Sequence, residues 1–134
     1  MTELELQAQV ADYIRLQHPS VIFHSDFGSG IKLTMGQAIR QKRLNGGRRS
    51  WPDMFIAETT IVKREDGTYD GLSGLFLELK REGTRIFKKD GTLVSDAHIR
   101  EQFDMLEQLR QRGYMAEFAC GFDEAKKIIE EYLG

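Results

Sequence analysis

The apolar positions of the chain recur with two different periods, and these periods predict its elements. Apolar spacing and end signals typical of helices are found in four segments, 2–17, 34–45, 96–112 and 123–133. Short β-rich or alternating segments lie between them, at 21–25, 54–58, 61–63, 75–80 and 114–119. The order α-β-α-β-β-α-β-α, with a further short strand possible after the Asp66-Gly67 turn, predicts an α/β fold with a mixed central sheet flanked by helices.

The ends of the first two predicted helices carry recognisable signals. Thr2 with Glu5, and Thr34 with Gln37, have the spacing of capping boxes, in which two side chains satisfy free backbone N–H groups.

Residues 26–30 are expected to form a loop. Residues 82–95 are expected to form a long polar loop, which is uncommon in a compact domain unless it is functional or disordered.

Length and composition place the chain among ordinary globular domains. Its 134 residues, 40% of them hydrophobic, predict one domain over 1–134 with a real core. Cys120 is the single cysteine, so it is expected to pack as a small hydrophobic residue in a reducing compartment. No signal peptide or membrane-spanning stretch is recognisable, and a cytoplasmic location without a membrane partner is expected.

Charge is distributed unevenly along the chain. Residues 32–100 hold 14 Lys/Arg against 9 Asp/Glu, whereas the two flanks together hold 5 against 12. The formal net charge is therefore only −2. A basic middle between acidic ends is compatible with one positive face that attracts a polyanion, and equally with an ordinary solvated surface.

The strand predicted at 75–80 carries the clearest chemical signal. Because strand side chains alternate between faces, its three leucines share one face, and Phe76, Glu78 and Lys80 share the other. Charges on a central strand are costly to bury and need a reason. The alternative is an edge strand, or a wet face on which the two charges simply pair.

A second acid stands at the start of another predicted strand. Pro52 can open that strand, and Asp53 follows it, although an aspartate here is also common as a turn or capping residue. If this strand runs antiparallel to the one with Glu78, the two carboxylates and Lys80 meet. Mg²⁺ would relieve the repulsion between the acids, with the Leu79 carbonyl as a further ligand. Lys80 would orient or deprotonate the attacking water, or stabilise the charge that develops on a phosphate.

This Pro-Asp … Glu-x-Lys pattern resembles the PD-(D/E)XK nuclease superfamily, and more narrowly the small stand-alone VRR-NUC domains found in phage proteins. The segments that carry the resemblance are 50–53, 78–80, the helix that holds Gln102, and Gly113-Tyr114. They extend over nearly the whole chain. The glycine that the family has before Pro-Asp is displaced here to Gly46 and Gly47.

The resemblance implies a restriction-endonuclease-like fold and a Mg²⁺-dependent DNA endonuclease, with Mn²⁺ as a substitute. It favours branched DNA such as a Holliday junction, and cutting a junction requires two sites and hence a homodimer. Asp53, Glu78, Lys80 and Gln102 would be catalytic. Asp53, Glu78 and Leu79 would hold the metal, and Glu5 is the candidate acid from the first helix, unless it serves only as a cap.

Basic residues that flank these acids in the sequence are candidates for phosphate contacts. They are Arg48, Arg49, Arg81, Arg85, Lys88 and Lys89. Trp51 could stack on a base but is more typical of packing, and the histidines 18, 24 and 98 are expected to be surface or packing residues. Two alternatives stay open: an inactive DNA-binding module of the same fold, and a nuclease directed at RNA.

Overall fold

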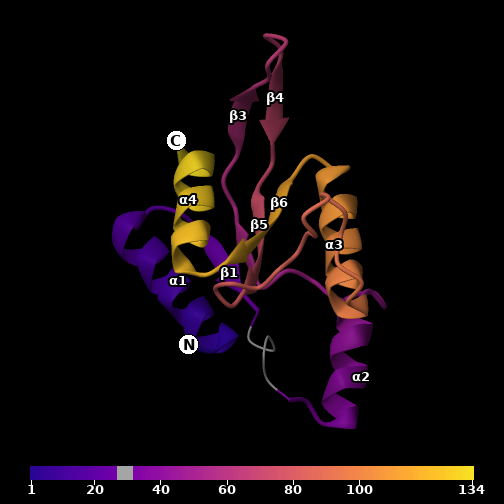
Figure 1. Cartoon of the computed structure of the whole chain (residues 1–134). Helices are drawn as coiled ribbons and strands as arrows, with labels where there is room; N and C mark the ends of the chain where they lie inside the picture. Colours follow the sequence, from indigo (N-terminus) through magenta and orange to yellow (C-terminus); the bar gives the residue numbers. More distant parts are fainter. Residues whose placement is uncertain (27–31) are drawn as a thin grey trace.

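The computed structural model describes residues 1–26 and 32–134, so the loop predicted at 26–30 lies outside the described residues from 27 onward. Four helices and six strands are present in these ranges (Figure 1). In chain order they are α1 (Glu3–Gln17), β1 (Phe23–Ser25), α2 (Met35–Leu44), β2 (Met54–Ile56), β3 (Thr60–Lys63), β4 (Tyr69–Leu72), β5 (Leu75–Lys80), α3 (Ala97–Arg110), β6 (Met115–Cys120) and α4 (Phe122–Leu133).

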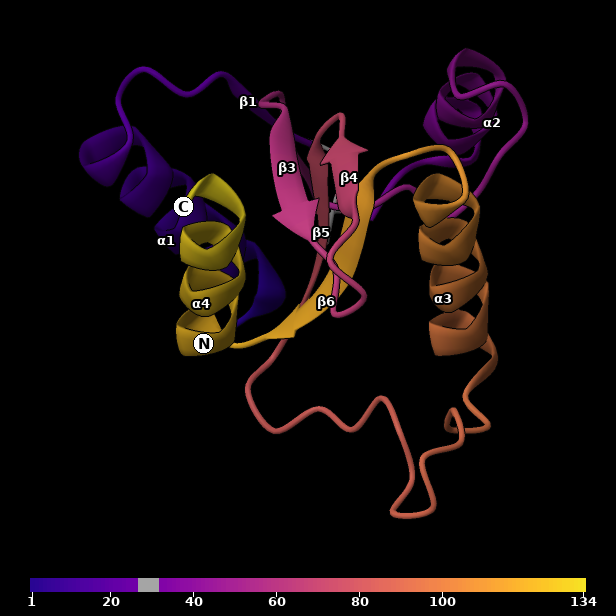
Figure 2. The ribbon, with the colours of Figure 1, turned by 90° about the horizontal axis from the view of Figure 1, so that it is seen from above.

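The central sheet is mixed, as the alternation of helices and strands predicted. Its strand order is β1-β2-β5-β6, with β1, β2 and β5 antiparallel and β6 parallel to β5. Helices α1 and α4 cover one face of the sheet, and α3 covers the other (Figure 2). The predicted α/β class with helices on a central mixed sheet is therefore confirmed.

Strand β5 divides the interior into two cores because its side chains alternate. Leu75, Leu77 and Leu79 pack with α1 and α4 in one cluster. Phe76 faces the second cluster, which contains Leu106 of α3 and Ala116 of β6. Glu78 and Lys80 are buried as well, so β5 is a central strand that carries two charges.

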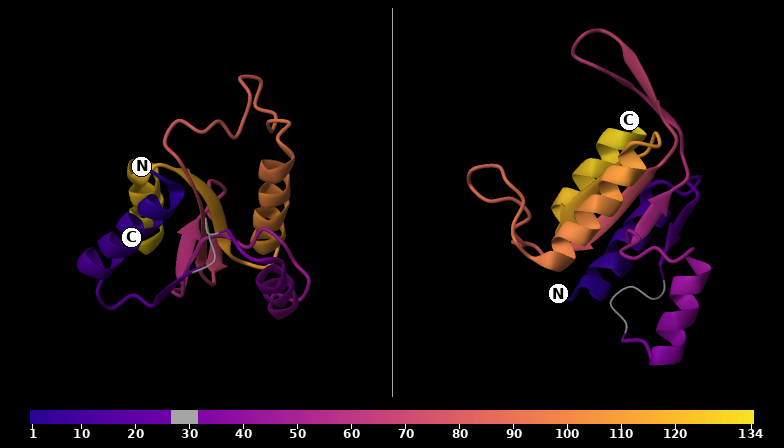
Figure 3. Two further views of the ribbon diagram at one scale, coloured as in Figure 1. Left: turned by 90° about the horizontal axis from the view of Figure 1, so that it is seen from below. Right: turned by 90° about the vertical axis from the view of Figure 1, so that its right-hand side faces the viewer.

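The hairpin after β2 forms a separate element. The further strand considered after Asp66-Gly67 is present as β4, which pairs with β3 in a two-stranded sheet. This β3–β4 arm projects from the body, and the 82–95 segment projects in another direction (Figure 3). Within 82–95 an isolated bridge joins Phe87 to Leu93, and Ile86 is buried against the α3 cluster. Within the described ranges, no helix combines the length and apolar character needed to cross a membrane.

Gly74 shows how closely β2 and β5 are packed. A Cβ atom at this position would lie 2.5 Å from the Phe55 ring and 3.1 Å from the Ile56 carbonyl oxygen. The ring cannot move freely, since its centroid lies 4.5 Å from that of Phe76. Gly74→Ala is expected to lower the free energy of unfolding by about 1–3 kcal/mol through overpacking.

Gly71→Ala in β4 is the matched control, because a Cβ atom added there would meet no atom of the described residues within 4 Å. Urea unfolding of both variants measures the difference. Equal stability of the two variants would contradict the close approach at Gly74.

Candidate active site

The antiparallel register of β2 and β5 brings the two acids together. Met54 pairs with Leu77, which sets Asp53 level with Glu78 across the strand pair. The Asp53 Oδ2 atom accepts a hydrogen bond of 2.7 Å from the Leu79 backbone N–H. Asp53 and Glu78 are only 8% and 5% exposed. Two carboxylates from distant parts of the sequence thus lie together in one buried region at the start of β2.

Glu78 is held in an environment that opposes its ionisation. Burial, followed by the negative charge of Asp53, raises the pKa of the Glu78 carboxyl well above its ordinary value, and the charge of Lys80 partly counteracts this. The Gln102 amide Nε2 donates a 2.7 Å hydrogen bond to Glu78 Oε1. The side chain is therefore fixed in place, and the acid pair favours a proton or a cation beside it.

Lys80 occupies the same buried region, with 7% of its surface exposed. Its Nζ atom lies 3.9 Å from Oε1 of Glu3 on α1. The acid expected from this helix was Glu5, but Glu5 is exposed and its backbone N–H is capped by Thr2. Helix geometry explains why Glu3 and not Glu5 faces the site, because residues two positions apart on a helix point in nearly opposite directions.

Gln102 and His98 lie one turn apart at the end of α3 that faces β5. The two Nε2 atoms are 3.2 Å apart. The Gln102 amide nitrogen therefore lies between the Glu78 carboxylate and the His98 ring. Gln102 Oε1 is buried and has no hydrogen-bond partner among the described residues. His98, expected to be a surface or packing residue, lines the site, and its i, i+4 spacing from Gln102 was the available signal.

Gln7 of α1 supports the site and was missed by sequence reasoning. Its buried Nε2 lies 3.1 Å from the Asp26 carbonyl oxygen and 3.4 Å from that of Asp53. The Asp26 N–H also donates to the Asp53 carbonyl, at 2.8 Å. These bonds join the ends of β1 and β2 to α1, and they hold the backbone of Asp53 in position.

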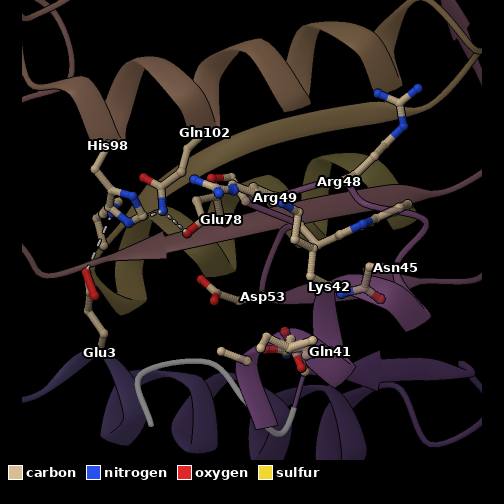
Figure 4. Close-up of a pocket in the computed structure, with 16 residues that line it drawn as sticks. Glu3, Gln41, Lys42, Asn45, Arg48, Arg49, Asp53, Glu78, His98 and Gln102 are labelled. Atoms are coloured by element: carbon tan, nitrogen blue, oxygen red, sulfur yellow. Dashed lines mark hydrogen bonds and ion pairs between the residues drawn. The ribbon is translucent and has the colours of Figure 1, made fainter. Parts of the chain in front are cut away.

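The acids form the floor of an open cavity of about 710 Å³ (Figure 4). Lys42, Arg48 and Arg49 stand on one side of it, and Gln102 and His98 lie on the α3 side. The full lining comprises Glu3, Asp26, Ala38, Ile39, Gln41, Lys42, Asn45, Arg48, Arg49, Ser50, Trp51, Asp53, Glu78, Lys80, His98 and Gln102.

Only two of the six basic residues expected to surround the acids line this cavity, Arg48 and Arg49. Arg81 borders a different cleft, with Glu82 and Cys120, and Arg85 borders a third. Lys88 and Lys89 are exposed in the projecting loop. That loop leaves β5 and runs away from α2 (Figure 2). Closeness in sequence to the acids therefore did not bring these four side chains to them.

Cys120 behaves as the sequence suggested. It is partly buried against the α3 cluster. Burial raises the pKa of the Cys120 thiol to about 11, so it stays protonated at neutral pH and is a poor nucleophile.

The donor set suits a hard divalent cation with few protein ligands. No group of three or more His, Cys, Asp or Glu residues gathers in residues 1–26 and 32–134. The Asp53–Glu78 pair alone supplies two carboxylates, and Mg²⁺ commonly uses one or two together with backbone oxygens and waters. The residues present thus fit a Mg²⁺-type ion and not a four-ligand zinc centre.

Comparisons with known proteins agree with the fold. No protein-family model and no curated protein matches the sequence. A solved structure described as a VRR_NUC domain protein matches with a TM-score of 0.65 and 22% identity, covering 99% of this chain and 88% of the other. The expected resemblance to VRR-NUC domains, and with it the nuclease fold, is confirmed as a likeness of structure.

Proposed function

We propose that this chain is a divalent-metal-dependent nuclease that hydrolyses phosphodiester bonds of DNA. The observation that carries the proposal is the buried pair Asp53 and Glu78, with Lys80 beside it, at the floor of an open cavity bordered by arginines. A buried pair of like charges is costly without a function, and a cation that also binds a phosphate supplies one.

Asp53, Glu78 and the carbonyl of Leu79 would hold Mg²⁺, with Mn²⁺ as a substitute. The Leu79 N–H donates to Asp53, and a strand residue directs its N–H and C=O toward the same neighbour. The Leu79 carbonyl therefore faces the Asp53 side of β5, beyond the last residue pair of β2 and β5, Met54 with Leu77. When bound, the ion supplies positive charge that polarises the scissile phosphate and lowers the pKa of a bound water.

The protein's own groups have separate roles in this proposal. Lys80 orients the attacking water or stabilises the charge that develops on the phosphate. Gln102 fixes Glu78 through its amide hydrogen bond. Glu3, which lies near Lys80, replaces Glu5 as the acid that α1 contributes, and it holds the ammonium group in position.

Arg48 and Arg49 would bind the phosphates on either side of the cut, because they border the same cavity. Trp51 packs against Phe76 at a centroid distance of 6.3 Å, but it is 37% exposed and lines the cavity, so part of its ring is available to stack on a base. The surface available to read bases is small, which favours recognition of DNA shape, such as a four-way junction. A homodimer would supply the two cuts, and exposed Ile61 and Tyr69 on the β3–β4 arm are candidates for its interface.

Cleavage of labelled duplex, four-way junction and RNA substrates tests the proposal. Cutting of DNA is expected with Mg²⁺ or Mn²⁺ and should stop in EDTA. Asp53→Asn should slow it by about a hundredfold or more, whereas Asp104→Asn, the same charge change on an exposed position of α3, should not. Undiminished cutting in EDTA or by Asp53→Asn would refute the site, and faster cutting of RNA would replace DNA as the substrate.

A further inference from the structure

Helix α2 is an element that buries none of its side chains. Its apolar residues Met35, Ile39 and Leu44 are 81%, 63% and 74% exposed. A helix of ten residues is marginal in water on its own, and most helices in proteins are stabilised by packing of an apolar face. Here a complete capping box of Thr34 and Gln37 supports the first turn. The exposed surface of α2 is therefore available to a binding partner outside the described fold.

The C-terminal end of α2 is nevertheless attached to the body. In the segment that follows it, Arg48 Nη1 donates a 3.0 Å hydrogen bond to Gln108, and Ser50 Oγ donates a 2.7 Å hydrogen bond to Glu101. Both acceptors are on α3. These contacts hold α2 beside the acid pair, as one wall of the cavity (Figures 1 and 4).

One face of α2 is directed into the cavity. Ala38, Gln41 and Lys42 line it together with the C-cap residue Asn45, and their spacing of i, i+3, i+4 and i+7 places them on a single side of a helix, with Ile39 at its edge. This face carries the Lys42 ammonium group, which only donates hydrogen bonds, and the carboxamides of Gln41 and Asn45, which donate and accept them. Such groups match phosphate oxygens, sugar oxygens and base edges better than they match an apolar ligand.

The charge around α2 points to a polyanion. Residues 32–52 contain six Lys/Arg and no Asp or Glu, although the whole chain has a net charge of −2. The basic residues are Lys32, Arg40, Lys42, Arg43, Arg48 and Arg49. An acid-free basic segment next to a buried acid pair is complementary to a strand whose phosphates extend beyond the pair on one side.

We propose that α2 is a DNA-docking helix, which lies along the backbone of the strand that enters the cavity. Lys42 contacts a phosphate, and Gln41 and Asn45 contact the adjoining nucleotides. The placement of the strand over Asp53 and Glu78 rests on the proposed nuclease function. Binding of DNA by the helix does not require cleavage, so the two ideas can fail separately.

The test is a binding measurement in EDTA, where no cutting is expected. Fluorescence anisotropy of a labelled four-way junction, and of a duplex of the same sequence, is followed at several salt concentrations. The triple variant Gln41→Ala, Lys42→Ala, Asn45→Ala should bind about thirtyfold more weakly, and the salt dependence should fall by about one phosphate contact. Because α2 has no buried residue, the variant should keep the parent's circular dichroism spectrum and melting temperature.

Lys127→Ala on α4 is the control, because it removes an exposed lysine from an element far from α2 (Figure 1). It should change the affinity less than about twofold. Protection of the 35–44 amides from hydrogen exchange when DNA is added would support the proposal independently.

Three results would overturn it. An affinity of the triple variant within about twofold of the parent would show that α2 does not hold DNA. A change from dimer to monomer in sedimentation, without loss of DNA affinity per subunit, would assign the helix to a second copy of the chain. Tighter, α2-dependent binding of an RNA of equal length would replace DNA as the occupant. If α2-dependent binding is found but the parent never cuts DNA with Mg²⁺, only the proposed nuclease function fails.

Discussion

Replacing Glu78 by Gln is expected to slow DNA cleavage by at least about a thousandfold, which corresponds to about 4 kcal/mol of transition-state stabilisation. The amide keeps the size of the side chain but removes the charge that the metal requires. Since Glu78 is 5% exposed and faces Gln102, little else in the site should change. Cleavage rates with saturating Mg²⁺ measure the loss.

The same substitution is expected to stabilise the protein when no metal is present. The pKa of Glu78 is raised above its ordinary value of 4.5 in the folded chain. Below that value both folded and unfolded chains hold the proton, and the acid causes no loss of stability. As the pH rises above 4.5 the unfolded chain ionises first, so the parent loses stability until the raised folded pKa is passed. The Gln variant does not titrate here, and its advantage should grow over this pH range.

Melting temperatures of both proteins in EDTA, measured from about pH 4 upward, test the direction of this effect. Glu131→Gln, on an exposed position of α4, is the control and should behave like the parent in both assays. If Glu78→Gln cleaved DNA at the parent's rate, the Glu78 carboxylate would not be part of the active site. An advantage that shrinks with rising pH would mean that Glu78 is not destabilised by burial.

Leu77→Ala is expected to lower the free energy of unfolding by about 3 kcal/mol, through lost burial and an unfilled cavity. Leu77 is completely buried at the centre of β5, between Met54 of β2 and Glu117 of β6. It packs in the cluster shared with α1 and α4. The strand that carries Glu78 and Lys80 therefore depends on this side chain for its position.

Urea unfolding followed by circular dichroism measures the change, with Ile61→Ala as the matched control. Ile61 lies in the projecting arm and is 72% exposed, so its truncation should alter stability by less than about 0.5 kcal/mol. A loss below about 1 kcal/mol at Leu77 would show that the core between β5 and the α1–α4 face is loosely packed.

Local sequence patterns were sufficient to predict the helices and strands, and to predict which side chains lie on each face of β5. The alternation of residues 75–80 correctly separated the leucines from Phe76, Glu78 and Lys80. The helix boundaries differ from the expected ones by one or two residues at most, since capping and stop signals act within a single turn. The sequence predicts that Asp53 meets Glu78 only on the condition that their strands pair antiparallel, and β2 and β5 meet that condition.

Local sequence patterns could not predict which side chains surround Asp53 and Glu78. Glu3 lies near Lys80 and Glu5 does not, which depends on how α1 is rotated against the sheet. Lys42 lines the cavity, while Lys88 and Lys89, nearer to Glu78 in the sequence, are exposed in a loop that runs away from α2 (Figure 2). Periodicity and capping arise from contacts between residues a few positions apart, so the chain's order of residues reveals them. The direction in which a loop leaves a sheet, and the face a helix turns inward, result from long-range packing that only the folded molecule specifies.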